Sequence, residues 1–278
     1  MSVIVLTLII LVGAYFAGLL GSLTGLGGGF IIIPLLTLGL HVNIHYAIGA
    51  SLVSVIATSS GSAAAYVKEG ITNIRIGMFL EIATTIGALA GAMLAMHVQT
   101  HVIAVIFGLI LAFSAFMSFI KKVEVINAEG SAAATTLRLN GTFPTADGPV
   151  KYGVHNVGGG FFMMVFAGMI SGLLGIGSGA LKVLAMDTIM RIPFKVSTTT
   201  SNFMIGVTAA ASAVVYLQRG YIDPGLSMPV VVGVLLGALS GSKILVHTKS
   251  SGWLRWVFTI VVGILAFQMI YNGITGKI

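Results

Sequence analysis

Long apolar runs with almost no charge are the feature that most constrains how this chain folds. Of its 278 residues, 57% are hydrophobic and only 8% are charged, whereas an ordinary soluble domain has about 25% charged residues. The formal charge of +7 is scattered between the runs. No basic face with interleaved aromatic residues accompanies it, so nucleic-acid binding is not expected. The sequence therefore predicts an integral membrane protein.

Several classes of chemistry are excluded by what the sequence lacks. It has no cysteine, which removes disulfide frameworks, thiolate nucleophiles and cysteine-type metal sites. It also has no His-Glu-x-x-His, Gly-x-Ser-x-Gly or phosphate-loop Gly-Lys-Ser/Thr motif. We therefore expect no catalytic residues, no metal site, no cofactor and no enzymatic activity.

Eight apolar runs approach the roughly 20 residues that a helix needs to cross a bilayer core of about 30 Å. The first run lacks a basic start and a small-residue cleavage site, so a retained helix is expected rather than a signal peptide. Shorter apolar pieces at 30–40 and 180–190 follow the first and fifth runs, and each is expected to be a half-helix or a re-entrant segment. The expected spans are 3–26, 46–67, 76–97, 102–120, 161–181, 197–217, 228–247 and 253–274.

The two halves of the chain match at a constant offset of 150 residues. We therefore expect an all-α membrane protein with two pseudo-symmetric repeats, residues 1–120 and 158–278, joined by a polar loop at 121–157. Such repeats are typical of transporters whose substrate site lies between the halves. Four crossings per half would make the repeats parallel, and five would invert them. The matching pairs include Gly18 and Gly168, Gly25 and Gly175, Ser51 and Ser201, Thr58 and Thr208, and Gly87 and Gly237.

The central loop alternates in polarity over residues 136–143 around the dipeptide Asn140-Gly141. This pattern favours a small β-hairpin that turns at the dipeptide, with a disordered linker as the alternative.

Cationic residues in the loops indicate an orientation. With four crossings per half, the positive-inside rule places both termini in the cytoplasm of a plasma-membrane protein. One side then collects Lys68, Arg75, Lys121, Lys122, Arg138, Lys151, Arg219 and Lys277, and the other collects Arg191, Lys195, Lys249 and Arg255.

Glycine clusters at Gly25–Gly29 and Gly175–Gly179 are the main candidates for a binding site. Glycine destabilises a helix interior by about 1 kcal/mol relative to alanine, so each cluster predicts a break. Broken backbone in a membrane must be satisfied by protein or by a wet cavity. The half-helix that follows would point free N–H groups into that cavity, which suits an anion. The candidate residues are Gly27, Gly28, Gly29, Gly177, Ser178 and Gly179.

Glycines spaced four apart also allow helices to pack closely without any ligand. For Gly87 with Gly91 and for Gly237 with Gly241, we expect packing alone. For the two clusters we expect both a break and packing.

Polar side chains beyond the half-helices complete the candidate site. Ser51 and Ser201 hold equivalent positions, and the Asn202 amide requires partners inside an apolar segment. Because charges in such segments are costly, Lys182 is expected either to neutralise a bound anion or to snorkel to the interface. Glu81 is expected to be either a membrane-edge carboxylate or a proton-coupling residue.

Several segments of the chain resemble the sulfite exporter TauE/SafE family of membrane permeases. They are Gly25–Leu35, the region of Ser51, Gly175–Gly179 and Ile192–Asn202. The resemblance covers nearly the whole chain outside 121–157. It implies a plasma-membrane transporter of about eight helices that moves sulfite or small organosulfonates such as sulfoacetate outward. The chain departs from the family pattern at Ser178, where a third glycine is common, and in the 121–157 insertion.

We expect a small anionic substrate and the lipid bilayer as partners, with self-association into a homo-oligomer left open. The alternative function is a selective anion channel, because anion pores also use helix dipoles and hydroxyls.

Overall fold

The computed structural model describes residues 3–24, 28–68, 70–119, 128–145, 148–247 and 252–277, and most of them are helical. Short π-helical segments, η1 (Leu35–Gly39) and η2 (Ala185–Ile189), continue α2 and α8. In the sequence, a small unit of α6, β1 and β2 separates the two sets of long helices. The elements are α1 (Val3–Thr24), α2 (Gly29–Pro34), α3 (Ile44–Lys68), α4 (Ile74–Ala95), α5 (Thr100–Phe119), α6 (Ala132–Thr136), β1 (Gly141–Thr145), β2 (Gly148–Tyr152), α7 (Val157–Leu174), α8 (Gly179–Leu184), α9 (Phe194–Gln218), α10 (Pro224–His247) and α11 (Gly252–Ile274).

Six of the described helices are long and apolar enough to cross a membrane, namely α1, α3, α4, α7, α9 and α10. The runs expected at 102–120 and 253–274 form α5 and α11, whose fully described parts include the apolar segments Thr100–Phe116 and Thr259–Ile274. A multi-pass helical membrane protein is therefore confirmed, with six membrane-length apolar helices among the fully described residues.

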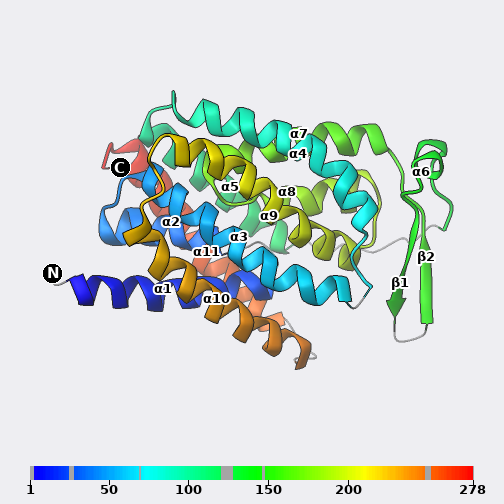
Figure 1. Ribbon diagram of the computed structural model, residues 1–278, viewed down its shortest axis with the longest axis horizontal. Coiled ribbons are helices and arrows are strands. Elements are labelled where there is room, and N and C mark those ends of the chain that lie inside the picture. Colours follow the sequence, from blue (N-terminus) through cyan, green and yellow to red (C-terminus); the bar gives the residue numbers. More distant parts are fainter. Residues whose placement is uncertain are drawn as a thin grey trace.

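The half-helix α2 with η1 turns back along α1. Gly28 lies against the backbone of Ala17, and Leu35, seven residues later, lies against Gly13. The two segments therefore run in opposite directions. The apolar piece expected at 30–40 is re-entrant, and α3 begins on the side of the molecule where α1 begins (Figure 1).

The two half-helices end alike. His41 and Arg191, which follow η1 and η2, have φ angles of 54° and 55°, and the next N–H in each case bonds to a carbonyl six residues earlier. Pro34 cannot donate a backbone hydrogen bond, but Leu184 stands in the corresponding place before η2. The proline is therefore not needed for the π-helical turn.

Close packing of backbones joins α1 to α10 and α4 to α7. A Cβ added to Gly237 would overlap the carbonyl oxygen of Tyr15, and one added to Gly87 would overlap that of Val165. These contacts are what small residues at regular spacing permit, and they match the packing role expected for both glycine pairs.

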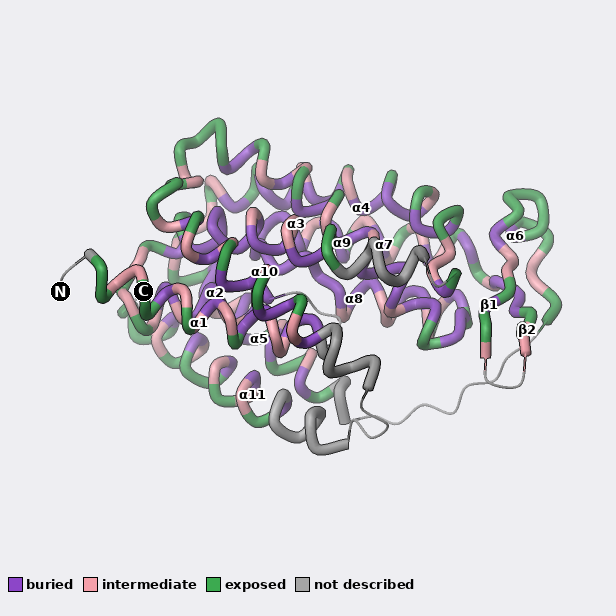
Figure 2. The backbone as a smooth tube through the Cα atoms, turned by 60° about the horizontal axis from the view of Figure 1, so that its bottom comes forward, coloured by how far each residue is buried: buried purple, intermediate pink, exposed green. Residues whose placement is uncertain are grey.

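Helices α3 and α9 lie at the centre and run antiparallel. His45, at the start of α3, stacks on Tyr221, just beyond α9, with ring centroids 4.9 Å apart. At the other end, the N–H of Asn73 donates to Oγ1 of Thr200 at 3.1 Å. In the segment Ile44–Gly61 of α3, 67% of the residues are buried, compared with 28% in Ile4–Ser22 of α1. Figure 2 shows this difference between the interior and the outer helices.

Both termini lie at one end of the molecule, and the unit of α6, β1 and β2 lies at the other (Figure 1). We call this second end the hairpin end.

The central loop contains the expected hairpin, but the predicted turn was wrong. β1 and β2 pair antiparallel, and Gly141 opens β1 instead of forming a turn. Asn140 Oδ1 accepts from the N–H of Val154 at 2.9 Å, and its Nδ2 donates to Thr135 at 3.2 Å. These bonds hold Asn140 between α6 and the segment after β2, so it cannot turn the chain. Residues 146–147, which connect the strands, lie outside the described residues.

Candidate functional site

The second glycine cluster interrupts its helix as predicted. Gly175, Gly177 and Ser178 have φ angles of 66°, 70° and 46°, a left-handed backbone that cannot continue a right-handed helix. α7 therefore ends at Leu174, and α8 begins at Gly179. In the first cluster, Gly28 forms a turn before α2; the candidate Gly27 lies outside the described residues.

The two glycine segments meet beside α3. Ser51 is fully buried, and its hydroxyl donates to the carbonyl oxygen of Gly175 at 2.8 Å. A Cβ added to Gly29 would overlap Ser51 Oγ and lie 3.2 Å from the same carbonyl oxygen. The structure thus brings Gly29, Ser51 and the second break into one place.

Ser201, the counterpart of Ser51, bonds within its own half. It is fully buried, and its hydroxyl donates to the carbonyl oxygen of Gly179, the first residue of α8, at 3.3 Å. The start of α8 is thereby fixed to α9. Ser178, just before it, is buried, and its hydroxyl has no hydrogen-bond partner among the described groups.

Asn202 lies where a side chain of α3 forms hydrogen bonds with the backbone of α9. Its side chain is 6% exposed, and its carbonyl accepts from the Ser59 hydroxyl at 2.6 Å. The same hydroxyl accepts from the N–H of Gly206 at 2.9 Å. In a regular α-helix the N–H of Gly206 would bond directly to the carbonyl of Asn202. Here the Ser59 hydroxyl lies between the two groups and bonds to both. This link between the halves was not predicted, and the hydroxyl-rich stretch around Ser59 was its only signal in the sequence.

Lys182 is fully buried, so it does not snorkel to the membrane surface. Its ammonium donates to the hydroxyl of Thr208 in α9. The same hydroxyl lies 2.7 Å from Oε1 of Glu81 in α4. Glu81 is itself only 8% exposed. The structure therefore joins the two charged candidates through Thr208, whose only signal in the sequence is its match to Thr58 in the repeat.

The contacts of Lys182, Thr208 and Glu81, here called the charged group, and the contacts of the two serines lie at different levels along α9. Thr208 follows Ser201 by seven residues, which corresponds to about 10 Å along a helix axis. Lys182 stands in the first turn of α8, and its side chain reaches Thr208. The candidates thus form two adjoining groups along α8 and α9, one at the glycine breaks and one around Thr208.

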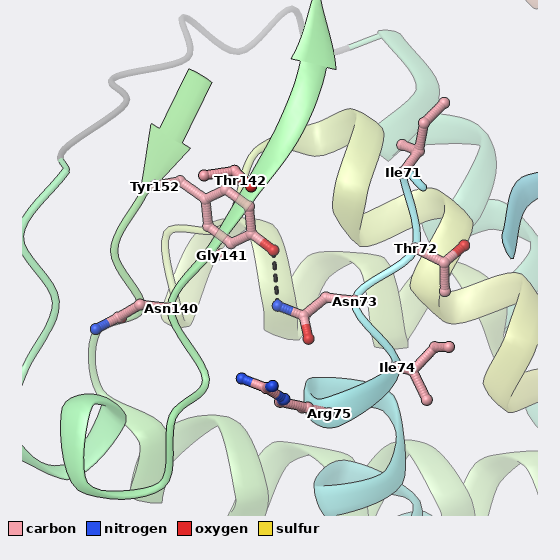
Figure 3. Close-up of a pocket in the computed structure, with 9 residues that line it drawn as sticks. All are labelled: Ile71, Thr72, Asn73, Ile74, Arg75, Asn140, Gly141, Thr142 and Tyr152. Carbon is pink, nitrogen blue, oxygen red and sulfur yellow. Dashed lines mark hydrogen bonds between the residues drawn. The ribbon is translucent and has the colours of Figure 1, made fainter. Parts of the chain in front are cut away.

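A pocket of about 250 Å³, lined by none of these candidate residues, lies between the α3–α4 connection and the hairpin (Figure 3). Asn73 organises this junction. Its Nδ2 donates to the Tyr152 hydroxyl at 2.7 Å and to the Leu139 carbonyl at 3.0 Å, and its Oδ1 accepts from the N–H of Ile76 at the start of α4. Burial raises the pKa of Tyr152 above its ordinary 10.0, and the bond from Asn73 lowers it in part. The junction attaches the hairpin to the membrane helices.

Comparison with known proteins places these features in a family. The family model described as sulfite exporter TauE/SafE matches residues 9–269. Bacillus subtilis "Probable membrane transporter protein YunE" is 29% identical over 96% of this chain and 98% of its own length. Methanocaldococcus jannaschii "Probable membrane transporter protein MJ0441" is 23% identical over 96% of each chain. No solved structure matches the chain.

Proposed function

This chain belongs to the sulfite exporter TauE/SafE family, and from that premise we propose that it is a secondary carrier for small sulfur-containing anions such as sulfite or sulfoacetate. The family and the names of its relatives make it a membrane transporter. The cargo and the direction, export, are proposed from the family description. The cell membrane is its proposed location.

The observation that carries the proposal is the meeting of Gly29, Ser51 and Gly175 between the two halves. Transporters built from repeats place substrate between the halves, where broken helices present their ends. Hydroxyl groups and backbone amides suit a sulfonate, because its three oxygens accept several hydrogen bonds and its delocalised charge limits the cost of losing water. We assign binding to Gly27, Gly28, Gly29, Ser51, Gly177, Ser178, Gly179, Ser201 and Asn202, with Lys182 supplying positive charge.

We also propose that the two halves are repeats of inverted topology. The antiparallel course of α3 and α9 supports this arrangement, as do the left-handed residues His41 and Arg191 and the two π-helical segments, each pair 150 residues apart. A parallel pair of repeats would require the two central helices to run in the same direction. Inverted repeats are a common basis for alternating access around a central site.

The fold leads us to reverse the orientation expected from the sequence. That expectation counted four crossings per half, but the re-entrant α2 returns the chain to the side where α1 begins. The positive-inside rule now favours a cytoplasmic hairpin end with both termini outside. Arg75, Arg138, Lys151, Arg191 and Lys195 lie at the hairpin end, and Arg219 and Lys277 lie at the end with the termini.

Two measurements on purified protein test the carrier proposal. Thermal-shift screening against sulfite, sulfoacetate, taurine and sulfate should show stabilisation by at least one sulfur anion. That anion should then exchange across proteoliposomes with saturable kinetics. An anion channel would instead give unitary conductance without saturable exchange.

Two variants test the binding residues. Ser201→Ala and Asn202→Ala should each weaken the thermal shift produced by the stabilising anion. If transport and stabilisation are unchanged in both variants, the site assignment fails while the carrier proposal stands.

A further inference from the structure

Lys182, Thr208 and Glu81 form a directed chain of hydrogen bonds. An ammonium group only donates, so Thr208 Oγ1 accepts from Lys182. The single hydroxyl proton of Thr208 then has three acceptors within reach: Glu81 Oε1 at 2.7 Å, the Met204 carbonyl at 3.0 Å and Thr84 Oγ1 at 3.4 Å. The carboxylate is the nearest and can carry charge. The buried cation is therefore linked to the buried carboxylate through one hydroxyl.

The elements around Glu81 bring it no other close charge in the described part of the chain. α4 adds the hydroxyl of Thr85, 3.4 Å from Oε1. Its Arg75 stands six residues before Glu81, about 9 Å along the axis, and Lys182 of α8 is the charge that acts on Glu81. α7, which packs on α4, contains no titratable residue. In α9, Lys195 and Tyr216 are 13 and eight residues from Thr208, which corresponds to about 20 Å and 12 Å along the axis.

The second carboxylate oxygen of Glu81 allows this side chain to gain or lose a proton. Oε2 of Glu81 is buried and has no hydrogen-bond partner among the described groups. Burial without a hydrogen-bond partner makes a charge on this oxygen costly, and a proton on Glu81 removes that cost. This series of hydrogen bonds exists once only, because the apolar residues Ile32 and Val231 stand at the positions equivalent to Lys182 and Glu81.

We propose that Glu81, Thr208 and Lys182 are the proton-coupling element of the carrier, so that a proton moves with each anion in the same direction. This inference rests on the proposed function. In the empty carrier, the Glu81 carboxylate balances the Lys182 ammonium through Thr208. When an anion takes the charge of Lys182, a proton from water bonds to a Glu81 oxygen and makes a neutral carboxylic acid.

Release on the other side reverses this step: the O–H bond of Glu81 breaks, the proton returns to water, and the pair with Lys182 forms again. For a monovalent anion the buried group is neutral both when empty and when loaded, which avoids the cost of moving an unpaired charge through the membrane. Coupling of this kind sets no direction by itself, and the combined gradients of anion and proton determine the flow.

Proteoliposomes with a trapped pH indicator test the coupling. The probes are radiolabelled methanesulfonate, which is monovalent, and sulfoacetate, which also has a carboxylate. The sulfonate group stays ionised near neutral pH, so a proton that moves with methanesulfonate is carried by the protein. Inward flux through the wild type should acidify the lumen. Glu81→Gln, which imitates the protonated state, should keep anion exchange but lose the acidification and the net uptake.

A matched pair of variants tests the link itself. Thr208→Val removes the shared hydroxyl and should lower the ratio of protons to anions. Thr58→Val, at the position 150 residues earlier, also removes a hydroxyl that bonds to its own helix and should keep the wild-type ratio.

The remaining outcomes of these experiments separate the coupling proposal from the carrier proposal. Anion uptake by the wild type without acidification, or acidification retained in Glu81→Gln, overturns the coupling and leaves the carrier proposal standing. If Glu81→Gln is not recovered as folded protein, an unchanged ratio in Thr208→Val overturns the coupling. If the wild type exchanges neither probe nor sulfite, the proposed function itself fails.

Discussion

The hydroxyl of Ser51 donates to the carbonyl oxygen of Gly175 at 2.8 Å, across 124 residues of sequence. This bond links α3 of the first half to the break before α8 in the second. Gly29 packs against the same two groups. At this point the two halves meet through Gly29 and the break at Gly175, so changes there should affect both stability and transport.

Ser51→Ala should lower stability and slow anion exchange. The variant removes a buried hydrogen bond, whose loss costs about 1 kcal/mol, and leaves the Gly175 carbonyl without this donor. Thermal unfolding of purified protein and exchange in proteoliposomes measure the two effects. The control is Ser60→Ala, because the exposed Ser60 hydroxyl bonds to a carbonyl of its own helix. Equal behaviour of the two variants would contradict the role of Ser51.

Gly29→Ala should abolish exchange or prevent folding. The added methyl would overlap Ser51 Oγ and press on Val55, and overpacking of this kind costs about 1–3 kcal/mol. Gly61→Ala in α3 is the matched control, since nothing lies within 4 Å of a Cβ there. The control should be as stable as the wild type or more so by up to about 1 kcal/mol. Thermal unfolding and exchange separate the outcomes, and wild-type exchange by Gly29→Ala would refute the close contact.

Lys182→Met should destabilise the protein by about 3–5 kcal/mol, because it leaves the buried Glu81 carboxylate without its counter-charge. The double variant Lys182→Met/Glu81→Gln removes both charges and should recover most of that stability without recovering anion exchange. Thermal unfolding and exchange in the same preparations check this prediction, with Lys277→Met near the C-terminus as the control. A double variant that transports normally would show that Lys182 serves only the structure.

Tyr152→Phe should loosen the hairpin from the membrane helices by about 1 kcal/mol, the value of one buried hydrogen bond. Asn73 loses its bond to the phenol but keeps the one to the Leu139 carbonyl. Hydrogen exchange in β1 and β2 measures the loosening. Exchange as slow as in the wild type would count against this role of the phenol.

The same tyrosine predicts a pH dependence. Its pKa is raised in the folded protein, so the neutral phenol is the form that the fold favours. The stabilisation is fully present below the ordinary pKa of 10.0 and is lost as the pH rises through the higher folded value. Hairpin protection should therefore fall in strongly alkaline solution for the wild type, and this loss should be smaller in Tyr152→Phe.

The glycine break at Gly175–Gly179 could be predicted from sequence because glycine acts locally on the helix that contains it. The packing of Gly87 and Gly237 was predictable for a similar reason, since regular spacing puts small residues on one helix face. The turn at Asn140-Gly141 was predicted wrongly because the tertiary bonds of Asn140 outweigh its local preference for a turn.

The charged group could be predicted only in part. Lys182 and Glu81 stood out individually, because charges in apolar segments require partners. Their connection depends on Thr208, which is 26 residues from Lys182 and 127 from Glu81, and no local pattern encodes which helix faces which. The side on which α3 begins was left open by the sequence, because it depends on whether α2 folds back along α1.

The central claim is that this chain carries small sulfur anions through a site where its two halves meet. Its most direct test is counterflow in proteoliposomes loaded with unlabelled sulfite or sulfoacetate and diluted into a trace of the labelled anion. The account predicts a transient, saturable accumulation of label that is absent in Lys182→Met/Glu81→Gln. Unitary conductance without accumulation, or accumulation that is unchanged in the double variant, would contradict it.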